Sequence, residues 1–402
     1  MAAPKTLNKI VHLTTVHDRR DTRIFRKECR SLAVAGYQVV LIAPGDSNDV
    51  ARDDPMEGVR CRLIGVARGR LSRMTRLVWR AYRAARCEQA NLYQFHDPEL
   101  LPVGLLLKLE GRTVVYDAHE SVPDGVHSKT YIPRLLQWPL AAVLNVIEKA
   151  TASLFDAVVA ATPAIAGRFS RRKTVLVQNY PVVGELHDDH SAADYLDREP
   201  LFGYVGAISA LRGIREVVDA VGAVASACDA RLLLAGRFAS PALQVDLSAT
   251  DGWRRVEFIG WQDREGVRSL LSRVRAGLVT FHPAPNHIRA QPNKLFEYMS
   301  AGIPVIASDF PLWREIVEST GCGLLVDPRD AAAVARAMTW ILQNPVEARE
   351  MGRRGREAVR TRFNWATQSR ALLDLYQRIL PPGSPGLASS KPVNNTARQR
   401  AG

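Results

Sequence analysis

Short apolar runs alternate with amphipathic stretches along most of this chain. Each run has the length of a buried strand, and the stretches between the runs repeat their apolar positions with the period of a helix. The runs of the first half are residues 9–14, 38–43, 92–95, 113–117, 157–160 and 175–177. Those of the second half are residues 201–205, 231–235, 256–259, 276–281, 303–307 and 324–326. The pattern predicts an α/β protein of two tandem Rossmann-like, doubly wound parallel-sheet domains, with an interdomain cleft at the carboxyl edges of the sheets.

Breaks in this pattern set the expected domain boundaries. Residues 181–200 are polar and acidic, so we interpret them as a linker between a first domain of residues 1–180 and a second domain of residues 201–363. A last helix is predicted for residues 364–380. Residues 381–402 are rich in Pro, Ser, Gly and Asn without a periodic apolar pattern, which favours a disordered tail.

The composition is that of a globular cytoplasmic protein. The chain has 402 residues, of which 47% are hydrophobic and 24% charged. It contains no apolar run of bilayer-spanning length, and its N-terminus lacks the pattern of a secretory signal, so neither a spanning helix nor export is expected. Its five cysteines are scattered without a Cys-x-x-Cys spacing, which predicts neither a disulfide framework nor a zinc site.

The positive charge adds a possible surface partner. The net charge is +13, and residues 60–86 contain nine arginines and no acidic residue. Residues 68–86 form a basic amphipathic helix in this interpretation, which suits the anionic surface of a membrane. A solvated arginine-rich face with its apolar side packed on the core explains the pattern equally well. No motif supports a nucleic-acid partner, and none is expected.

Candidate chemistry is concentrated in residues 291–309. Pro292 and Asn293 suit a helix start, and Gly302 suits its left-handed end. The free N–H groups at such a helix start attract phosphate, and Lys294 adds a cation there. Glu297, one turn further along, is placed to accept hydrogen bonds from sugar hydroxyls. The segment therefore predicts a seat for a sugar nucleotide.

Residues 292–328 resemble the donor-binding region of retaining glycosyltransferases with the GT-B fold, specifically the bacterial family 4. That family has two glutamates with seven residues between them, of which the second matches Glu297 and the first falls on Arg289. The resemblance implies transfer of a sugar from a nucleoside diphosphate, UDP more than GDP, to an acceptor hydroxyl, without a metal or other cofactor. It also implies that the last helix crosses back to the first domain. Arg289 either receives a negatively charged donor sugar or faces solvent.

A second donor-binding segment follows the strand at residues 201–205. Gly206 permits close approach of the backbone, and Arg212 either binds the diphosphate or caps its own loop. Trp261, at the end of another strand, either stacks on a base or packs in the core. The predicted donor-binding residues are Gly206, Arg212, Arg289, Asn293, Lys294, Leu295 and Glu297.

Polar residues also follow three strands of the first domain. His119 matches the family's histidine near the donor sugar, so the resemblance implies catalytic roles for His119 and Glu297. His96 is a candidate on the acceptor side, with a hydrogen-bonded loop residue as the alternative. The acceptor-side loop contributes Asp18, Arg19 and Arg23, unless they form only salt bridges within the loop. Neither histidine cluster has metal-ligand spacing, so no metal site is expected.

The identity of the acceptor is open at this stage. The arginine-rich segment favours a lipid-linked glycan in surface-polysaccharide or cell-wall assembly, with the enzyme lying peripherally on the inner face of the cell membrane. A glycosyltransferase for a small secondary metabolite fits the same sequence. A nucleotide-sugar epimerase of this fold, or a non-catalytic sugar-nucleotide binding protein that lacks the first glutamate, are further alternatives.

Overall fold

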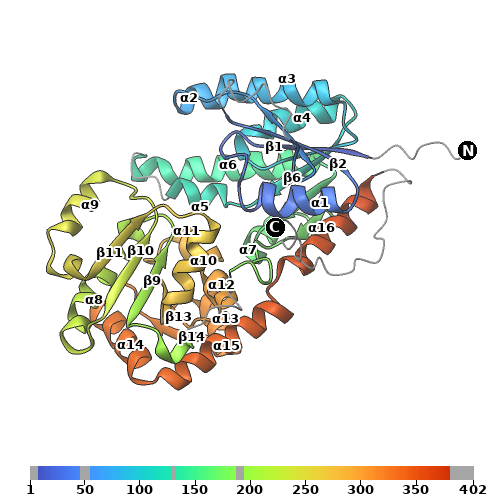
Figure 1. Cartoon of the computed structure of the whole chain (residues 1–402). Coiled ribbons are helices and arrows are strands. Elements are labelled where there is room, and N and C mark those ends of the chain that lie inside the picture. The colour runs from blue at the N-terminus through green and yellow to red at the C-terminus, as the bar shows by residue number, and fades with distance from the viewer. Residues whose placement is uncertain (1–7, 46–54, 128–131, 187–193, 381–402) are drawn as a thin grey trace, which may run out of the picture. The chain divides into compact units, whose positions relative to one another are not determined.

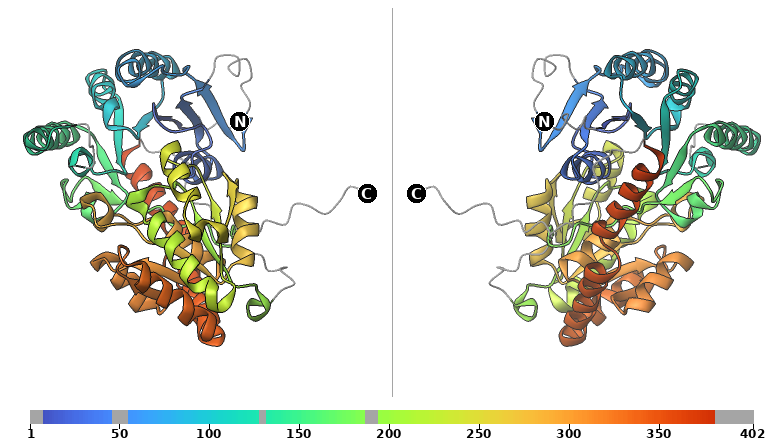
Figure 2. Two further views of the ribbon diagram at one scale, coloured as in Figure 1. Left: turned by 90° about the vertical axis from the view of Figure 1, so that its left-hand side faces the viewer. Right: turned by 90° about the vertical axis from the view of Figure 1, so that its right-hand side faces the viewer.

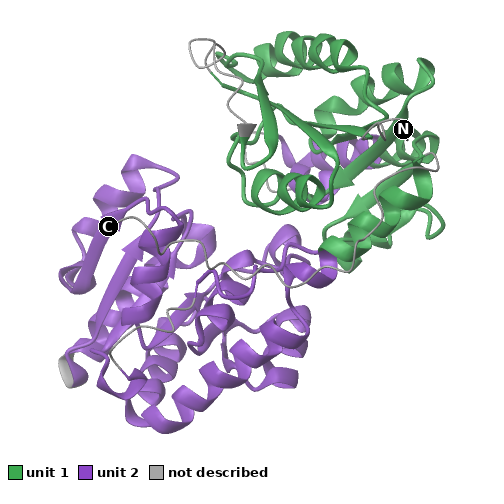
Figure 3. Cartoon of the chain, turned by 45° about the vertical axis from the view of Figure 1, so that its right-hand side comes forward, with its two compact units in different colours: residues 1–120, 145–177, 369–402 green, residues 121–144, 178–368 purple. Residues whose placement is uncertain are grey.

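A computed structural model describes residues 8–45, 55–127, 132–186 and 194–380 (Figure 1). The predicted tail of residues 381–402, and residues 187–193 of the predicted linker, lie outside the described residues. The chain divides into two compact units (Figure 3). Unit 1 comprises residues 1–120, 145–177 and 369–402, and unit 2 comprises residues 121–144 and 178–368.

The sheet of unit 1 has eight strands in the order β3-β4-β2-β1-β5-β6-β7-β8. The strands are β1 (Lys9–Leu13), β2 (Gln38–Ala43), β3 (Pro55–Met56), β4 (Val59–Leu63), β5 (Leu92–Phe95), β6 (Thr113–Ala118), β7 (Ala157–Ala160) and β8 (Thr174–Leu176). All neighbours pair in parallel except β3 with β4. The chain changes direction across the sheet at β1, which pairs with β2 on one side and β5 on the other. Ligands in doubly wound sheets bind at the carboxyl ends of the strands at such a switch point.

Helices cover both faces of this sheet. They are η1 (Ile24–Cys29), α1 (Arg30–Val34), α2 (Arg70–Ser72), η3 (Arg73–Leu77), α3 (Val78–Glu88), η4 (Pro98–Leu100), α4 (Leu101–Leu109), the second half of α6 (Arg134–Leu154), α7 (Pro163–Ala166) and most of α16 (Trp365–Ile379). Helix α1 lies on one face, and α3, α4 and α6 lie on the other (Figure 2). On α16, the Tyr376 hydroxyl donates to Gln94 Oε1 over 2.5 Å, which fixes the last helix to β5.

The sheet of unit 2 has six parallel strands in the order β11-β10-β9-β12-β13-β14. They are β9 (Leu201–Val205), β10 (Arg231–Ala235), β11 (Val256–Gly260), β12 (Ala276–Val279), β13 (Val305–Ser308) and β14 (Gly323–Val326). Its switch point lies between β9 and β12. The helices are α5 (Val122–His127), the first half of α6, η5 (Tyr195–Asp197), η6 (Ala210–Arg212), α8 (Ile214–Cys228), α9 (Pro241–Ser248), η7 (Asp251–Arg255), α10 (Arg264–Arg273), α11 (Pro285–Ile288), α12 (Asn293–Ala301), α13 (Pro311–Thr320), α14 (Ala331–Gln343) and α15 (Pro345–Thr361).

The prediction of two doubly wound parallel-sheet domains is therefore confirmed. Two strands of the first sheet were not predicted. Strand β3 is only two residues long, and β4 carries Arg60 and Arg62, which reach Glu88 at the sheet edge and mask the apolar pattern. Among the helices within the described ranges, none has both the length and the apolar character needed to cross a bilayer.

Candidate functional site

Helix α12 supplies the centre of the candidate site in unit 2. It begins after Pro292 and ends at Gly302, whose φ of +74° is the left-handed conformation that glycine adopts without strain. Tyr298 joins the helix to the sheet, because the N–H of Val205 donates to its hydroxyl over 3.0 Å. Helix α12 is thereby held beside the carboxyl end of β9, at the switch point of the sheet.

Lys294 is the most unusual residue of α12. Its side chain is buried, with the residue only 6% exposed, yet Nζ has no hydrogen-bond partner. Nζ lies 3.7 Å from the centre of the Tyr204 ring and 5.0 Å from that of Phe281. Burial lowers the pKa of Lys294 well below its usual value, the charge of Arg212 lowers it further, and Glu297 acts in the opposite direction. A buried cation without a partner is costly unless a ligand pairs with it.

Arg212 brings a second cation to the same place. Its guanidinium carbon lies 5.1 Å above the centre of the Phe281 ring, which Lys294 also approaches. The loop that carries it leaves β9 at Gly206, which has a φ of +116° and open space where a side chain would be. Two converging cations beside exposed backbone and a helix start form a site suited to a polyvalent anion such as a diphosphate.

Glu297 is fixed in position by an ion pair that sequence reasoning missed. Its Oε1 accepts a hydrogen bond of 2.6 Å from Nη1 of Arg264, at the start of α10. Arg264 in turn donates two hydrogen bonds of 2.9 Å to Glu185. These carboxylates raise the pKa of Arg264 despite its burial. The Glu297 carboxylate is thus oriented before any ligand binds. No sequence motif indicates this ion pair, which only the contact in space reveals.

The other donor-binding candidates of unit 2 are spread around this centre. Arg289 is largely exposed, and its Nη1 lies 3.6 Å from Oδ1 of Asp124 in α5. Asn293 accepts a hydrogen bond of 3.0 Å from Asn179. The predicted donor contact of Leu295 is corrected by the structure. Its side chain is fully buried in the core, and its N–H donates to the carbonyl of Pro292. The core packing considered for Trp261 is also wrong, since this residue is 61% exposed.

His119, which follows β6 in unit 1, pairs with a second histidine. Its Nε2 lies 3.1 Å from Nε2 of His17, in the loop after β1. Burial lowers the pKa of His119. Burial also opposes the charged form of His17, but the hydrogen bond and charge of Asp21 prevail and raise its pKa. The two shifts run in opposite directions, so of this pair His17 takes up a proton more readily than His119 does.

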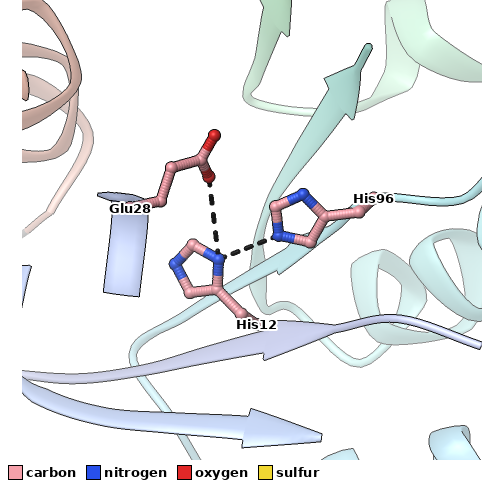
Figure 4. Close-up of side chains that lie close together, drawn as sticks. All are labelled: His12, Glu28 and His96. Atoms are coloured by element: carbon pink, nitrogen blue, oxygen red, sulfur yellow. Dashed lines mark hydrogen bonds and ion pairs between the residues drawn. The ribbon is translucent and has the colours of Figure 1, made fainter. Parts of the chain in front are cut away.

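His96 lies deeper, in a buried layer under the ends of β1, β5 and β6. Its Nδ1 is 2.7 Å from Asp117, and its Nε2 is 2.9 Å from Nδ1 of His12. Figure 4 shows His96, His12 and Glu28, whose carboxylate lies 3.9 Å from His12. Burial, and then the neighbouring His96, lower the pKa of His12 well below its usual value. Both ring nitrogens of His96 are engaged in this layer, which favours the structural alternative over contact with an acceptor.

The acceptor-side loop is divided between surface and core. Asp18 is exposed and caps the turn by accepting a hydrogen bond from the N–H of Arg20, and Arg19 is half-buried. Arg23 is buried instead, because its guanidinium donates to both oxygens of Asp117 over 2.8 and 2.9 Å and to the carbonyl of Val177 over 2.9 Å. These contacts engage Arg23 in holding strand ends together, which leaves Asp18 and Arg19 as the acceptor-side candidates.

Side chains with metal-ligating atoms also gather in unit 1. Three groups in the described residues bring such atoms within 4.8 Å of one another. They are His12, Glu28 and His96; His17, Asp97 and His119; and His96, Asp117 and His119. Spacing along the sequence did not reveal these groups, because their members come from different strands, from the loops that follow them and from helix η1. Hydrogen bonds such as that between His17 and His119 account for the short distances.

Models of known protein families match both units of the chain. Residues 22–183 match the glycosyl transferase 4-like domain, and residues 199–344 match the glycosyl transferases of group 1. The chain is 29% identical over 188 residues to a phosphatidyl-myo-inositol mannosyltransferase of Mycobacterium leprae, an alignment that covers 46% of each protein. It is 30% identical over 168 residues to the D-rhamnosyltransferase WbpZ of Pseudomonas aeruginosa, which covers 40% of this chain and 41% of that protein. These alignments span less than half the length of either relative.

Solved structures share the fold over nearly the whole chain. Sucrose-phosphate synthase from Thermosynechococcus elongatus aligns with a TM-score of 0.75 and 22% identity, covering 92% of this chain and 98% of that one. Anabaena HepE in complex with UDP-glucose aligns with a TM-score of 0.70 and 15% identity, covering 92% and 100%. With both of its α/β units matched in this way, the chain belongs to the glycosyl transferases of group 1 and has the GT-B fold.

Proposed function

We propose that the protein is a retaining glycosyltransferase of family 4 that moves a sugar from a nucleoside diphosphate, preferably UDP, to an acceptor hydroxyl. The observation that carries this proposal is the buried ammonium of Lys294, which has no hydrogen-bond partner and lies beside Arg212 at the start of α12. Relatives described as a mannosyltransferase and a rhamnosyltransferase, and the complex of HepE with UDP-glucose, support a sugar-nucleotide donor.

In the proposed reaction, the bond between the sugar carbon C1 and the diphosphate oxygen breaks first. Lys294, Arg212 and the helix start stabilise the negative charge that develops on the leaving diphosphate. The acceptor oxygen then bonds to C1 on the same face, and its proton passes to an oxygen of the departing phosphate. These fixed cations supply the charge that the leaving group requires, so we propose no metal or other cofactor.

Glu297 and His119 position the donor in this proposal. The Glu297 carboxylate, oriented by Arg264, accepts hydrogen bonds from the ribose hydroxyls of the nucleotide. Burial lowers the pKa of His119, which favours its neutral form, and its buried Nδ1, which has no hydrogen-bond partner, is available to a sugar hydroxyl while Nε2 faces His17. Arg289 remains a candidate for the contact with the transferred sugar.

Binding of the donor should stabilise the folded protein. We expect one nucleotide among UDP, GDP and ADP, with its sugars, to raise the melting temperature. At a concentration of about 100 times Kd, the stabilisation is about 2.7 kcal/mol. The shift should be lost in Glu297→Ala and kept in Glu265→Ala, a matched change of an exposed glutamate on α10. Differential scanning fluorimetry measures it, and equal shifts in both variants would contradict the assigned role of Glu297.

We further propose a lipid-linked acceptor, reached by an enzyme that lies peripherally on the inner face of the membrane. On the segment of residues 68–86, Arg76 and Arg83 are exposed, as are the apolar residues Leu71, Met74 and Trp79. The alternative, that the apolar side of this segment packs on the core, holds for Val78 and Tyr82. It does not hold for Leu71 and Met74, which are exposed. An exposed surface with both arginines and large apolar groups favours contact with anionic lipid.

Charge reversal should weaken this contact. The variant Arg76→Glu/Arg83→Glu should lose binding to vesicles that contain phosphatidylglycerol, because each cation contributes about 1 kcal/mol near such a surface. Vesicle flotation at low salt measures the loss. Arg336→Glu/Arg353→Glu, which changes two exposed arginines of unit 2, is the control for net charge. Full transfer activity on a small soluble acceptor without vesicles would instead favour the secondary-metabolite enzyme.

A further inference from the structure

Helix α6 exposes an unusually apolar surface. The helix has 21 residues, which corresponds to about 32 Å. A single stripe faces the protein, where Ala141, Glu148, Thr151 and Ala152 are buried. The Glu148 carboxylate in this stripe accepts a hydrogen bond of 2.8 Å from Tyr116 and pairs with Arg168, which anchors α6 to the sheet of unit 1.

Large apolar side chains cover the opposite side of α6. Leu135 is 90% exposed, and the least exposed of the group, Leu140, is still 39% exposed. The members of this apolar face are Leu135, Leu136, Trp138, Leu140, Val143, Val146, Ile147 and Leu154. Single exposed apolar residues are ordinary on protein surfaces, whereas a contiguous set along one helix marks a surface that binds something.

The charges of α6 indicate which partner suits this face. Its ionisable residues are Arg134, Glu148 and Lys149, and the only carboxylate among them is buried. The exposed ionisable groups are therefore both cationic. If a second copy of the chain paired through this face, neither cation would meet a carboxylate of the partner helix. In an anionic bilayer, by contrast, the lipid phosphates can pair with both cations, because the headgroups lie next to the acyl chains that receive the apolar side chains.

We propose that α6 lies in the interface of an anionic lipid bilayer, with its apolar face among the acyl chains and with Arg134 and Lys149 at the headgroups. Its buried stripe remains on the protein, so the helix lies along the membrane and does not span it. This inference goes beyond the proposed transfer reaction and concerns a surface separate from residues 68–86. It adds an apolar contribution to membrane binding that salt does not screen.

Vesicle flotation at two salt concentrations tests this proposal. Vesicles of phosphatidylcholine with about 30% phosphatidylglycerol should bind the full chain at low salt, and a part of this binding should persist at about 0.5 M salt, where charge attraction is screened. The variant Leu135→Ser/Val143→Ser/Val146→Ser should lose the persistent part by about tenfold or more. The control Val34→Ser/Val245→Ser/Val346→Ser removes three equally exposed apolar residues elsewhere and should bind as the wild type does.

Tryptophan fluorescence gives a second measurement that does not depend on affinity. Trp138 should move from water into the interface, so its emission shifts to shorter wavelength on vesicle binding. In a Trp79→Phe background, which removes the exposed tryptophan of residues 68–86, Trp138→Phe should remove most of that shift. Two results would overturn the proposal: persistent binding that is unchanged in the α6 variant, or a dimer in light scattering that only the α6 variant converts to monomer. Thermal stabilisation by UDP tests the donor site without vesicles. A failure of the proposed transfer function can therefore be told apart from a failure of the proposed membrane contact of α6.

Discussion

Replacing Lys294 by methionine should raise the melting temperature of the free protein and nearly abolish sugar transfer. Methionine fills a similar volume without the charge that burial disfavours, so the folded state loses a source of instability. We expect an increase of about 2–5 °C. Transfer should fall about 100- to 1,000-fold, because a fixed charge that stabilises the leaving diphosphate is removed.

The pH dependence of stability separates this explanation from simple repacking. The pKa of Lys294 is lowered in the folded state, while in the unfolded chain it stays near 10.4. Between these two values the unfolded state binds a proton that the folded state lacks, so the contribution of Lys294 to stability improves as pH rises. The advantage of Lys294→Met should therefore shrink as pH rises toward the unfolded value, because the proton that the lysine releases on folding is then released at a lower free-energy cost.

Donor binding should reverse this shift in the pKa of Lys294. A diphosphate beside the ammonium favours the charged form, so binding should draw a proton from solution wherever the free enzyme holds Lys294 neutral. Calorimetric titration with UDP in two buffers of different ionisation enthalpy measures that uptake. The control Arg336→Met removes an exposed cation of unit 2 and should change neither the melting temperature nor transfer. A Lys294→Met protein that still transfers sugar at the wild-type rate would contradict the assigned role.

The fold was largely predictable because its signal is periodic. Strands such as β2 and β10 are short apolar runs bounded by helices, and their bounds could be read directly from the sequence. Both ends of α12 were predictable for a related reason, since Pro292 marks the backbone geometry at its start and Gly302 that at its end. Where side-chain charge obscured the period, as in β4, the prediction failed.

Contacts between distant residues could not be predicted in the same way. Arg264 and Glu297 are 33 positions apart, and nothing in either segment indicates that their side chains meet. Arg23 shows the opposite difficulty. It belongs to a charged loop, which predicted exposure to solvent, yet it is buried against Asp117 of β6, the carbonyl of Val177 after β8 and Glu28 of η1. Burial of a charge depends on what surrounds it in space, and the local sequence does not record those neighbours.

Removing the Arg23 guanidinium should destabilise the protein more than any other single change in unit 1 that we consider. In Arg23→Met, the buried Asp117 carboxylate loses both of its hydrogen bonds from arginine. Glu28 cannot replace the lost charge, because a carboxyl group carries no positive charge in either protonation state, and burial and the charge of Asp117 already raise its pKa well above the usual value. We expect a loss of about 3–5 kcal/mol in the free energy of unfolding, measured by urea denaturation. Arg30→Met, which breaks an exposed ion pair with Glu57, should cost about 0–1 kcal/mol.

The cost of Arg23→Met should depend on pH with a defined sign. Although burial opposes the charged form of Asp117, the charge of Arg23 prevails and holds its pKa well below the usual range. A lowered pKa gives stability that is present above the unfolded value, near 3.9, and is lost as pH falls through the folded value. The difference between wild type and variant should thus be largest near neutral pH and should narrow below about pH 4. In the double variant Arg23→Met/Asp117→Leu, part of the stability should return, since the buried Asp117 carboxylate that lost its arginine is removed as well. A double variant no more stable than Arg23→Met would show that lost packing around Arg23, and not the stranded carboxylate, sets the cost.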